Sequence, residues 1–388
     1  MKLLRIAVSG LPLLKSKCEI DFFAQQRVTG DNEEKMSCIF SRGSTRIYQN
    51  NVMSFIGINA SGKTTILKLI SFVCEMLNNQ SLNNASYNEI LDGLAEYDKV
   101  SFDIFFYSEN DTINYLHTVI GKEKERYVIL DETLKTKPSS KVTSKVNLFD
   151  FDDCGSVMSR NNDEAFLLDD VSIIVAFNKK AHDSIAMTEM LRHTNTNQLS
   201  ISDDCPIEMI AFFDPSIEYL HVKSNSKDSD IRLKFVGEEE IVLHQLADLN
   251  RYLSSGTIKG INTFVNAVKV FETGGYLIID EIENHFNREI VSTLIRFFMD
   301  KRVNPKGAML IFSTHYAELL DEFERNDIVY IVRNRNGISA ENLSTLLKRN
   351  DIKKSEAYQS GFLEGTVPMY EAYMDLKKAL IRSQREGE

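Results

Sequence analysis

The residues best suited to chemistry lie in the stretch 52–65, where Gly57, Gly62, Lys63 and Thr64 fit the pattern G-x-x-x-x-G-K-[ST]. Each of these positions serves a polyphosphate. The glycines let backbone N–H groups turn toward a phosphate, and the helix that follows presents its positive N-terminal end. Lys63 supplies a point charge, and the Thr64 hydroxyl can ligate Mg²⁺. The pattern therefore predicts a site for a nucleoside triphosphate.

Two more strand ends carry side chains that would complete such a site. The apolar run Tyr276–Ile279 ends in Asp280 and Glu281, and a second run, Met309–Phe312, leads to His315. A buried strand would fix Asp280 where its carboxylate can hold Mg²⁺, and Glu281 could orient the attacking water or accept its proton. His315 would then contact the γ-phosphate.

A second phosphate-binding device stands between these motifs. Ser254, Ser255 and Gly256 form a turn that opens a helix with apolar residues at helical spacing. The exposed N–H groups of such a helix start can bind an anion. We therefore expect this turn to contribute to nucleotide binding.

The elements that must position these residues are visible in the apolar pattern. The run Val52–Ile56 predicts a strand directly before the phosphate loop. A helix is predicted directly after it, with an apolar face formed by Ile66, Leu67, Leu69, Ile70, Phe72, Val73, Met76 and Leu77. The groups expected to bind the nucleotide in the loop are Gly57, Asn59, Ser61, Gly62, Lys63, Thr64 and Thr65.

Length and composition indicate a large globular protein in a reducing compartment. The chain has 388 residues, of which 43% are hydrophobic and 26% charged, and its net charge is −11. An acidic chain is not suited to coating DNA non-specifically. The 5 cysteines lack metal-ligand spacing, and no apolar stretch is long enough to span a membrane. We therefore expect a cytoplasmic protein.

The chain divides into four parts by pattern. Residues 1–135 should hold an antiparallel β layer and the phosphate loop, and residues 136–240, where periodicity weakens, an inserted variable and largely helical lobe. Residues 241–347 should complete the nucleotide core, and residues 348–388 should form a helical tail. The predicted fold class is α/β, with a mixed-sheet core, an antiparallel layer and an inserted lobe.

The order and spacing of the four motifs resemble those of ABC-type P-loop ATPases. The signature Leu-Ser-Ser-Gly-Thr ending at Thr257 and the run Asp-Glu-Ile-Glu-Asn-His at 280–285 resemble the OLD (overcoming lysogenisation defect) branch most. Members of that branch are soluble and often belong to anti-phage defence cassettes or to DNA transactions. The resemblance covers roughly residues 1–130 and 240–345. The stretch after His315 is too short for the Toprim nuclease domain of full OLD nucleases, so we expect none.

The resemblance implies a role for each motif. The phosphate loop would bind ATP, Thr64 and Asp280 would hold Mg²⁺, Glu281 would be the catalytic base and His315 the γ-phosphate sensor. In ABC-type dimers the signature closes on ATP held by the other subunit, so Ser254, Ser255 and Gly256 would act in trans. ATP hydrolysis would then require a homodimer or higher homo-oligomer. Glu283, Asn284 and His285 would lie in a loop that communicates between subunits.

Some features of the family are not found in the sequence. The phosphate loop has Ala60 where many relatives have glycine, and the glutamine that usually links the γ-phosphate to the helical lobe cannot be identified. Tyr48 and Phe23 are weak candidates for stacking on adenine. A sustained heptad pattern is missing between residues 136 and 253, which excludes a long coiled coil.

The leading hypothesis is an ATPase that dimerises around ATP and controls a separate effector protein in anti-phage defence. One alternative is a DNA-binding repair or recombination ATPase with a basic groove at Lys348, Arg349, Lys353 and Lys354. A less favoured alternative is the nucleotide-binding subunit of a transporter, which the signature and Ile282 disfavour. The sequence does not name the effector or the trigger.

Overall fold

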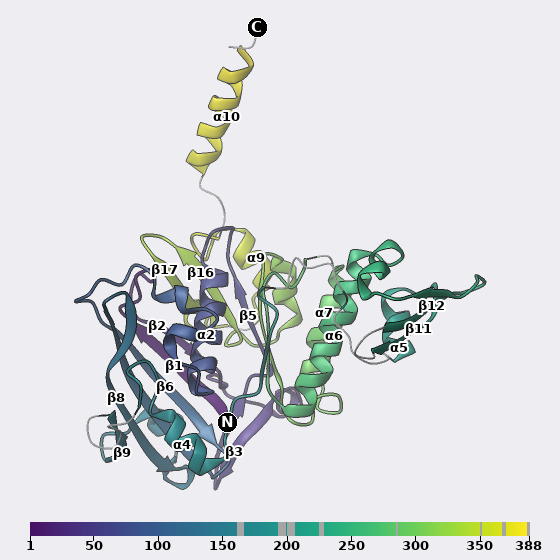
Figure 1. Cartoon of the computed structure of the whole chain (residues 1–388). Helices are drawn as coiled ribbons and strands as arrows, with labels where there is room; N and C mark the ends of the chain where they lie inside the picture. The colour runs from purple at the N-terminus through teal and green to yellow at the C-terminus, as the bar shows by residue number, and fades with distance from the viewer. Residues whose placement is uncertain are drawn as a thin grey trace.

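The computed structural model describes residues 1–160, 167–192, 199, 206–224, 229–284, 286–349, 351–366 and 370–385. It contains two large β-sheets packed on either side of one helix, a smaller lobe, and a helix at the C-terminal end that stands away from the rest (Figure 1).

The central sheet has the strand order β10-β14-β15-β5-β16-β17. Its strands are β10 (Met187–Glu189), β14 (Tyr276–Ile279), β15 (Met309–Thr314), β5 (Val52–Ile56), β16 (Val329–Asn334) and β17 (Ile338–Asn342). The first five are parallel, and only the pairing of β16 with β17 is antiparallel. Every residue of β5, β14 and β15 is buried, because parallel strands are covered on both faces. Their carboxyl ends therefore meet at one edge.

Helices cover both faces of the central sheet. Helix α2 (Lys63–Leu77) packs against Tyr276 and Ile278 of β14 on one face, whereas the alternate residues Leu277 and Ile279 face the other side. That side is covered by α6 (Ser255–Thr273) and α7 (Arg288–Met299). Because side chains alternate along β14, this one strand contributes to two separate hydrophobic cores, one on each face of the sheet.

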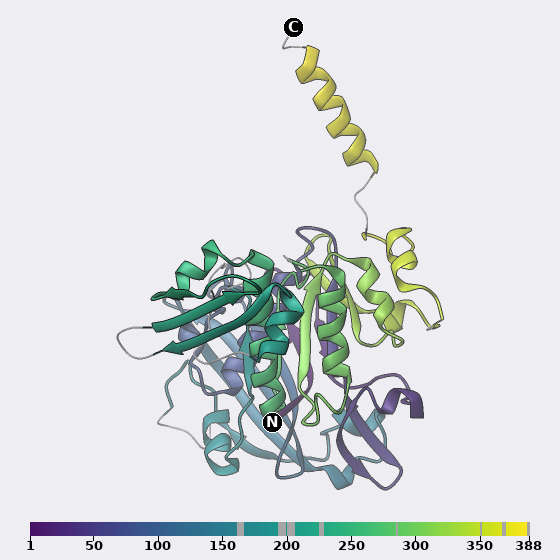
Figure 2. The same ribbon diagram turned by 90° about the vertical axis from the view of Figure 1, so that its right-hand side faces the viewer.

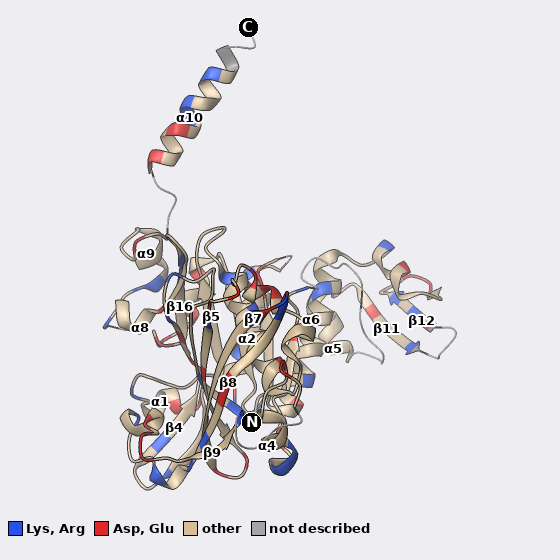
Figure 3. Ribbon diagram, turned by 60° about the vertical axis from the view of Figure 1, so that its left-hand side comes forward, with Lys and Arg blue, Asp and Glu red and all other residues tan. Residues whose placement is uncertain are grey.

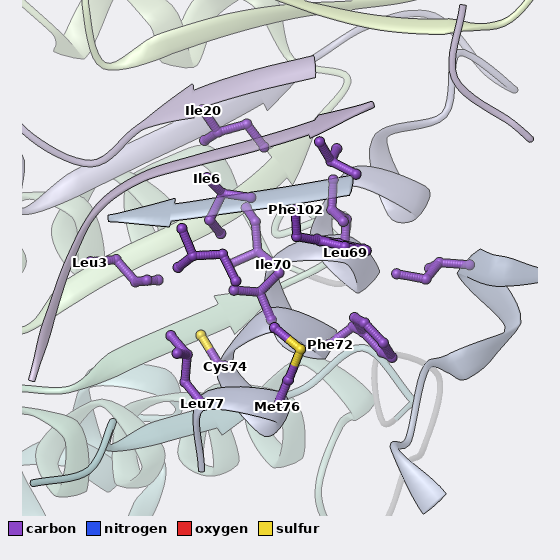
Figure 4. Close-up of a cluster of buried hydrophobic side chains, with 14 of the residues drawn as sticks. Leu3, Ile6, Ile20, Leu69, Ile70, Phe72, Cys74, Met76, Leu77 and Phe102 are labelled. Atoms are coloured by element: carbon purple, nitrogen blue, oxygen red, sulfur yellow. The ribbon is translucent and has the colours of Figure 1, made fainter. Parts of the chain in front are cut away.

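The second sheet is entirely antiparallel, as predicted, and has the order β2-β1-β6-β7-β8-β9. Its strands are β2 (Cys18–Asp21), β1 (Lys2–Ser9), β6 (Val100–Ser108), β7 (Thr112–Glu123), β8 (Arg126–Pro138) and β9 (Ser156–Ser159). Its inner face packs on α2, where Ile6, Ile20 and Phe102 meet Leu69 and Ile70 (Figure 4). Helix α2 is therefore buried between the two sheets.

The inserted segment is less helical than expected, although the mixed α/β class is confirmed. Its described residues include the helices α4 (Ile174–Ala181) and α5 (Ile207–Phe213). They also include β9, an edge strand of the antiparallel sheet, and β10, an edge strand of the central sheet. A third sheet comprises β11 (Ile217–Ser224), β12 (Ser229–Phe235) and β13 (Ile241–Leu243). Ile231 and Leu233 alternate with charged residues, which is a strand pattern inside the stretch predicted to be largely helical.

Short elements connect these layers. The antiparallel hairpin of β3 (Ser37–Arg42) and β4 (Thr45–Gln49) follows α1 (Gly30–Glu33) and leads into β5. Turns of 3₁₀ helix occur at Leu82–Asn84, Asn88–Leu91, Ser139–Lys141, Val146–Phe149, Leu246–Arg251 and Ala317–Glu322.

The C-terminal part forms α8 (Leu343–Leu346), α9 (Lys354–Gln359) and α10 (Tyr370–Arg385). The expected terminal helix from Met369 is confirmed from Tyr370 onward, and Met369 lies outside the described residues. A view turned by 90° again shows α10 projecting from the body (Figure 2).

Candidate functional site

The phosphate loop connects the buried end of β5 to the start of α2. A Cβ added at Gly57 would lie 2.4 Å from both Ser61 Oγ and Val332 O, and one added at Gly62 would meet the Ile338 side chain at 2.6 Å. Gly62 also has φ +98°, a backbone conformation that residues with a side chain rarely adopt. Both glycines are therefore required by the local geometry.

Ala60 and Ser61 show how tightly this loop is wound. Ala60 has φ +60°, a left-handed conformation that costs a non-glycine residue about 1 kcal/mol or more. The Ser61 hydroxyl is buried, and no hydrogen-bond partner is found for it among the described residues. Asn59 directly precedes Ala60 in the loop, and Thr65 lies in the first turn of α2. A wound loop with a spare buried hydroxyl fits the binding of a phosphate.

The Lys63 ammonium bends back over the loop. Its Nζ donates hydrogen bonds to Gly57 O at 3.0 Å and to Ile58 O at 3.3 Å, and it lies 3.4 Å from His315 Nδ1. Burial lowers the pKa of Lys63, while the nearby carboxylate of Asp280 opposes that shift. A partly desolvated cation that has two carbonyl oxygens and a histidine ring as partners is suited to an anionic ligand.

A hydroxyl and a carboxylate meet where the sequence predicts the metal. Thr64 Oγ1 donates a hydrogen bond of 2.6 Å to Asp280 Oδ2, and the Ser313 hydroxyl donates to Asp280 Oδ1. Asp280 follows the last residue of β14 and is 9% exposed. Mg²⁺ prefers oxygen ligands of this kind and usually binds through one or two carboxylates plus phosphate oxygens. Thr64 and Asp280 therefore fit a magnesium ion.

Glu281 occupies a strained position at the strand end. Its φ is +47°, and its backbone N–H donates to Ser313 Oγ at 2.8 Å. The carboxylate accepts a hydrogen bond of 2.7 Å from Asn284 Nδ2, and its other oxygen lies 3.4 Å from His315 Nε2. Strained backbone of this kind concentrates at functional sites. The carboxylate is thus held beside the phosphate loop, with one close hydrogen bond and one longer contact, where it can act as a general base.

His315 links the two sides of the site. It follows β15, with one ring nitrogen 3.4 Å from Lys63 and the other 3.4 Å from Glu281. Its backbone N–H donates to Glu283 Oε1 at 2.5 Å. Glu283 is 7% exposed, so this residue positions the histidine strand end and does not project outward as expected of an inter-subunit loop. His285, the other residue expected there, lies outside the described residues.

An open cleft of about 390 Å³ lies beside these groups. It is lined by Gly57, Ile58, Asn59, His315, Tyr358 and Thr366. The last two belong to the segment 354–366, which no motif identifies. The structure therefore adds a C-terminal wall to the predicted site.

The signature residues lie at the start of α6. The Ser254 hydroxyl accepts a hydrogen bond of 3.1 Å from Thr257 N and caps the helix, with Ser255 and Gly256 in its first turn. The helix then runs 19 residues back to β14. Gly260 is needed for close packing, because a Cβ there would lie 2.4 Å from the Phe213 ring of α5. The described lining of the phosphate-loop cleft does not include these signature residues.

The comparison with known families agrees with this geometry. The family described as AAA domain, putative AbiEii toxin, Type IV TA system matches residues 52–321. The chain belongs to this family. The matched region extends from β5 past His315 and includes the inserted segment, so the chain carries a P-loop ATPase domain of the ATP-binding and hydrolysing type. No curated protein matches the chain.

Two parts of this AAA-domain protein lie outside the family match. The strands β1 and β2 precede it, and the cleft wall at 354–366 and helix α10 follow it. None of the helices among the described residues combines the length and apolar character needed to cross a bilayer.

Sequence reasoning missed the edge strand β10. Its parallel pairing with β14 brings Glu189 to the edge that carries Asp280, and the Glu189 carboxylate accepts a hydrogen bond of 2.8 Å from Leu191 N. The strand β10 has only three residues and lies in a stretch with weak periodicity, so its sequence does not predict a strand.

The two adenine-stacking candidates are core residues at the other end of β5. Tyr48 is 6% exposed on β4, and its hydroxyl donates to Glu33 at 2.8 Å. Phe23 is 4% exposed and pairs with Gln49 in an isolated bridge. Both precede the first residue of β5, whereas the phosphate loop follows its last residue. The candidate assignment is therefore wrong for both.

Proposed function

We propose that this protein is an ABC-type ATPase of the OLD branch that forms a homodimer or higher homo-oligomer around ATP and controls a separate effector in anti-phage defence. The observation that carries the proposal is the meeting of residues from three segments at one sheet edge. Thr64 is bonded to Asp280, and His315 lies between Lys63 and Glu281.

The chain's own groups divide the work of hydrolysis. Lys63 and the loop N–H groups bind and orient the phosphates. Glu281 orients the attacking water and accepts its proton, since its carboxylate is 44% exposed and close to the loop. His315 senses the γ-phosphate from the opposite side. Mg²⁺, when bound by Thr64 and Asp280, would neutralise charge that develops on the phosphate oxygens.

Dimerisation would complete the site. The start of α6 offers backbone N–H groups for an anion, yet Ser254, Ser255 and Gly256 are not among the residues that line the described cleft of the same chain. A second copy could bring its signature turn to this cleft, whose phosphate-loop side is open. Each ATP would then be bound by the phosphate loop of one copy and the signature turn of the other.

Control of an effector and a role in defence are supported by motif variants and by the family description. Leu-Ser-Ser-Gly-Thr and the run 280–285 resemble OLD proteins, and the matching family is described as a putative toxin of a type IV toxin–antitoxin system. The described residues show no cluster of three or more His, Cys, Asp or Glu that could hold a metal ion elsewhere. We infer that the downstream activity belongs to a partner protein.

The DNA-binding alternative loses support from its basic residues. Lys354 is 4% exposed and its Nζ donates to Phe323 O at 2.7 Å, so it cannot contact a phosphate backbone. Arg349 is paired with Asp351, and Lys353 with Glu356. These local ion pairs leave little net positive charge on the segment. A transporter subunit is disfavoured by the signature and by Ile282 after the strand end.

The test is the oligomeric state of Glu281→Gln with and without ATP and Mg²⁺, measured by light scattering after co-expression with the adjacent gene. Blocked hydrolysis should trap an ATP-dependent assembly that retains the neighbouring gene product. Glu109→Gln, an exposed residue in the β6–β7 turn, is the matched control and should assemble only transiently. If ATP does not change the assembly, the proposal that two copies share each ATP is contradicted. If ATP drives the assembly but the neighbouring gene product is not retained in it, control of that effector is contradicted.

A further inference from the structure

The turn that follows β14 carries most of the negative charge at the phosphate-loop edge. The strands β5, β14 and β15 have no charged residue along their length, so the charges of this edge come from the segments after them; β5 can be followed in Figure 3. In this turn Asp280, Glu281 and Glu283 stand close together in the sequence. Like charges disfavour one another, so each carboxylate needs donors of its own to stay ionised and oriented.

The backbone of this turn is fixed to the end of β15. The Glu281 N–H donates to Ser313 Oγ at 2.8 Å, and the Ile282 N–H donates to Ser313 O at 3.1 Å. Ile282 is 1% exposed and packs in the core. The Asn284 N–H then donates to Glu281 O at 2.8 Å and closes the turn. Backbone hydrogen bonds therefore set where Asn284 stands relative to Glu281.

The Asn284 side chain makes the two oxygens of the Glu281 carboxylate unequal. Its Nδ2 donates to Glu281 Oε2 at 2.7 Å. An ionised carboxylate can only accept, so the amide group that faces it is the NH₂. The other oxygen, Oε1, lies 3.4 Å from His315 Nε2, which is longer than an ordinary N–H···O hydrogen bond. Oε1 therefore keeps its capacity to accept a hydrogen bond from water.

The exposure of Glu281 makes such an anchor important. Its side chain is 44% exposed, and an exposed glutamate samples several rotamers. Asn284 has a shorter side chain, is half-buried and stands on a fixed backbone. Its hydrogen bond to Oε2 selects the rotamer that keeps Oε1 beside His315. A general base works only within hydrogen-bond reach of the proton that it accepts, so this selection bears directly on the rate of hydrolysis.

We propose that Asn284 is a positioning residue for hydrolysis: it anchors Oε2 of Glu281 and leaves Oε1 to orient the attacking water. The water oxygen bonds to the γ-phosphorus and its proton passes to Oε1. The bond from that phosphorus to the bridging oxygen breaks, and ADP leaves with the electron pair. The inference rests on the proposed function, because it requires Glu281 to be the general base. It replaces the subunit-contact role that the resemblance implies for Asn284 with a role inside one chain.

The first test measures kcat and KM for ATP in Asn284→Ala and Asn284→Asp. The first variant removes the donor, and the second keeps the size of the side chain but places an acceptor there. In both, kcat should fall about 10–100-fold, as expected for a misplaced catalytic group. KM should stay unchanged, because Asn284 is not among the residues that line the described cleft. Wild-type kcat in either variant would overturn the proposal.

Asn287→Ala is the matched control for a purely structural effect. Asn287 Oδ1 accepts a hydrogen bond of 3.0 Å from Ile290 N and caps α7. Its substitution should lower the melting temperature and leave kcat unchanged. Thermal unfolding of the Asn284 variants verifies that they are folded, and Asn284→Asp provides the measurement if Asn284→Ala does not fold. A fall in kcat of Asn287→Ala equal to that of the Asn284 variants would show a structural effect of the whole turn and overturn the proposal.

The second test adds Asn284→Ala to Glu281→Gln. A residue that acts only through the Glu281 carboxylate should cause no further loss of hydrolysis in this background, and ATP should still drive assembly. A further loss, or loss of the ATP-dependent assembly, would place the role of Asn284 elsewhere and overturn the inference. If Glu281→Gln alone hydrolyses ATP like the wild type, the proposed general base fails and the inference fails with it. If Glu281→Gln is impaired and Asn284→Ala is not, only the inference fails.

Discussion

Charged residues in two parts of this molecule have opposite surroundings. In the antiparallel sheet, Glu132 is 0% exposed and accepts hydrogen bonds of 2.7 Å from Thr118, Ser172 and the Ile173 N–H. At the phosphate-loop edge, Glu281 has one close partner and a second contact at 3.4 Å. The first carboxylate is saturated by the protein, whereas the second has capacity left for a ligand.

The lysines follow the same division. Lys137 in the antiparallel sheet donates to Asn147 O at 2.7 Å and to Asp150 O, and its Nζ lies 4.2 Å from the centroid of the Phe151 ring. Lys63 Nζ contacts Gly57 O, Ile58 O and His315 Nδ1 at 3.0, 3.3 and 3.4 Å, and these three residues line the open cleft. Saturated charges hold segments together, and underused charges at a cleft are available for chemistry.

Backbone strain is distributed in the same way. Around the phosphate loop, Ala60 and Glu281 adopt positive φ within functional motifs. In the antiparallel sheet, positive φ occurs at Asp111, Lys124 and Glu125, which are hairpin turn positions where it is ordinary. The comparison predicts that substitutions at the edge change activity and that substitutions in the sheet change stability.

The largest expected effect is on hydrolysis by Glu281→Gln. Removing a general base typically lowers the rate by about 10²–10⁴-fold. ATP affinity and melting temperature should stay close to those of wild type, because the Glu281 side chain is 44% exposed and the substitution keeps its size. Steady-state phosphate release, with Glu109→Gln as control, measures this. Equal hydrolysis by Glu281→Gln and wild type would remove Glu281 from its assigned role.

Glu132→Ala should act on stability instead. It leaves several buried donors without an acceptor, at a cost of about 3 kcal/mol in the free energy of unfolding. The fraction that remains folded should hydrolyse ATP at the wild-type rate. Urea unfolding measures the loss for Glu132→Ala and for the control Asp131→Ala. Asp131 is a half-buried neighbour, so its substitution should change the free energy of unfolding little. A normally stable Glu132→Ala with impaired hydrolysis would break the division between the two regions.

Lys63→Ala should weaken ATP binding without destabilising the fold. Charge-assisted hydrogen bonds contribute about 1.5–3 kcal/mol, which corresponds to a roughly 10–100-fold rise in Kd. Titration with a fluorescent ATP analogue measures the change. Lys68→Ala, on the same helix but paired at the surface with Glu89, serves as control and should bind normally. Unchanged affinity in Lys63→Ala would mean that the ammonium does not reach the phosphates.

Ala60→Gly should relieve strain in the loop. The left-handed conformation costs alanine about 1–2 kcal/mol, and the added chain entropy of glycine offsets part of this. We expect the free energy of unfolding to rise by no more than about 1 kcal/mol, with hydrolysis retained. A stability loss in thermal unfolding would show that the Ala60 methyl group makes contacts that outweigh the strain.

The smallest effect concerns pH and the antiparallel sheet. The hydrogen bond from His117 to Asp103 raises the pKa of His117 above its ordinary value. A raised histidine pKa stabilises the fold fully below about pH 6.5, and this contribution is lost as pH rises through the folded-state pKa. The free energy of unfolding of the wild type should therefore decline between pH 6 and 8. His117→Gln should not show this decline. Parallel curves for both proteins would contradict the assignment.

The motif residues were predictable because each lies next to a strong local signal. Gly57, Lys63, Asp280 and His315 each follow or precede a fully buried apolar strand, and parallel strands bring their ends to one edge. The β layer was predictable from alternation in β6 and β7. Local pattern thus identified the sheet edge and most of its chemical groups.

The remaining features depend on contacts between distant parts of the chain. Tyr358 and Thr366 reach the cleft only because Lys354 and Arg333 fix their segment from other elements. Glu283 resembled a loop residue but turns inward to bind the His315 N–H. Contacts of this kind leave no period or spacing in the sequence.

The central claim, that each ATP is bound by residues of two copies, is tested most directly by mixing two inactive variants. Lys63→Ala removes the phosphate-loop cation, and Ser255→Arg obstructs the signature turn. Each alone should fail to hydrolyse ATP, because both of its composite sites are defective. A mixed dimer has one intact site, so the account predicts that activity returns on mixing. No recovery, while each variant still associates with wild type, would contradict the shared site.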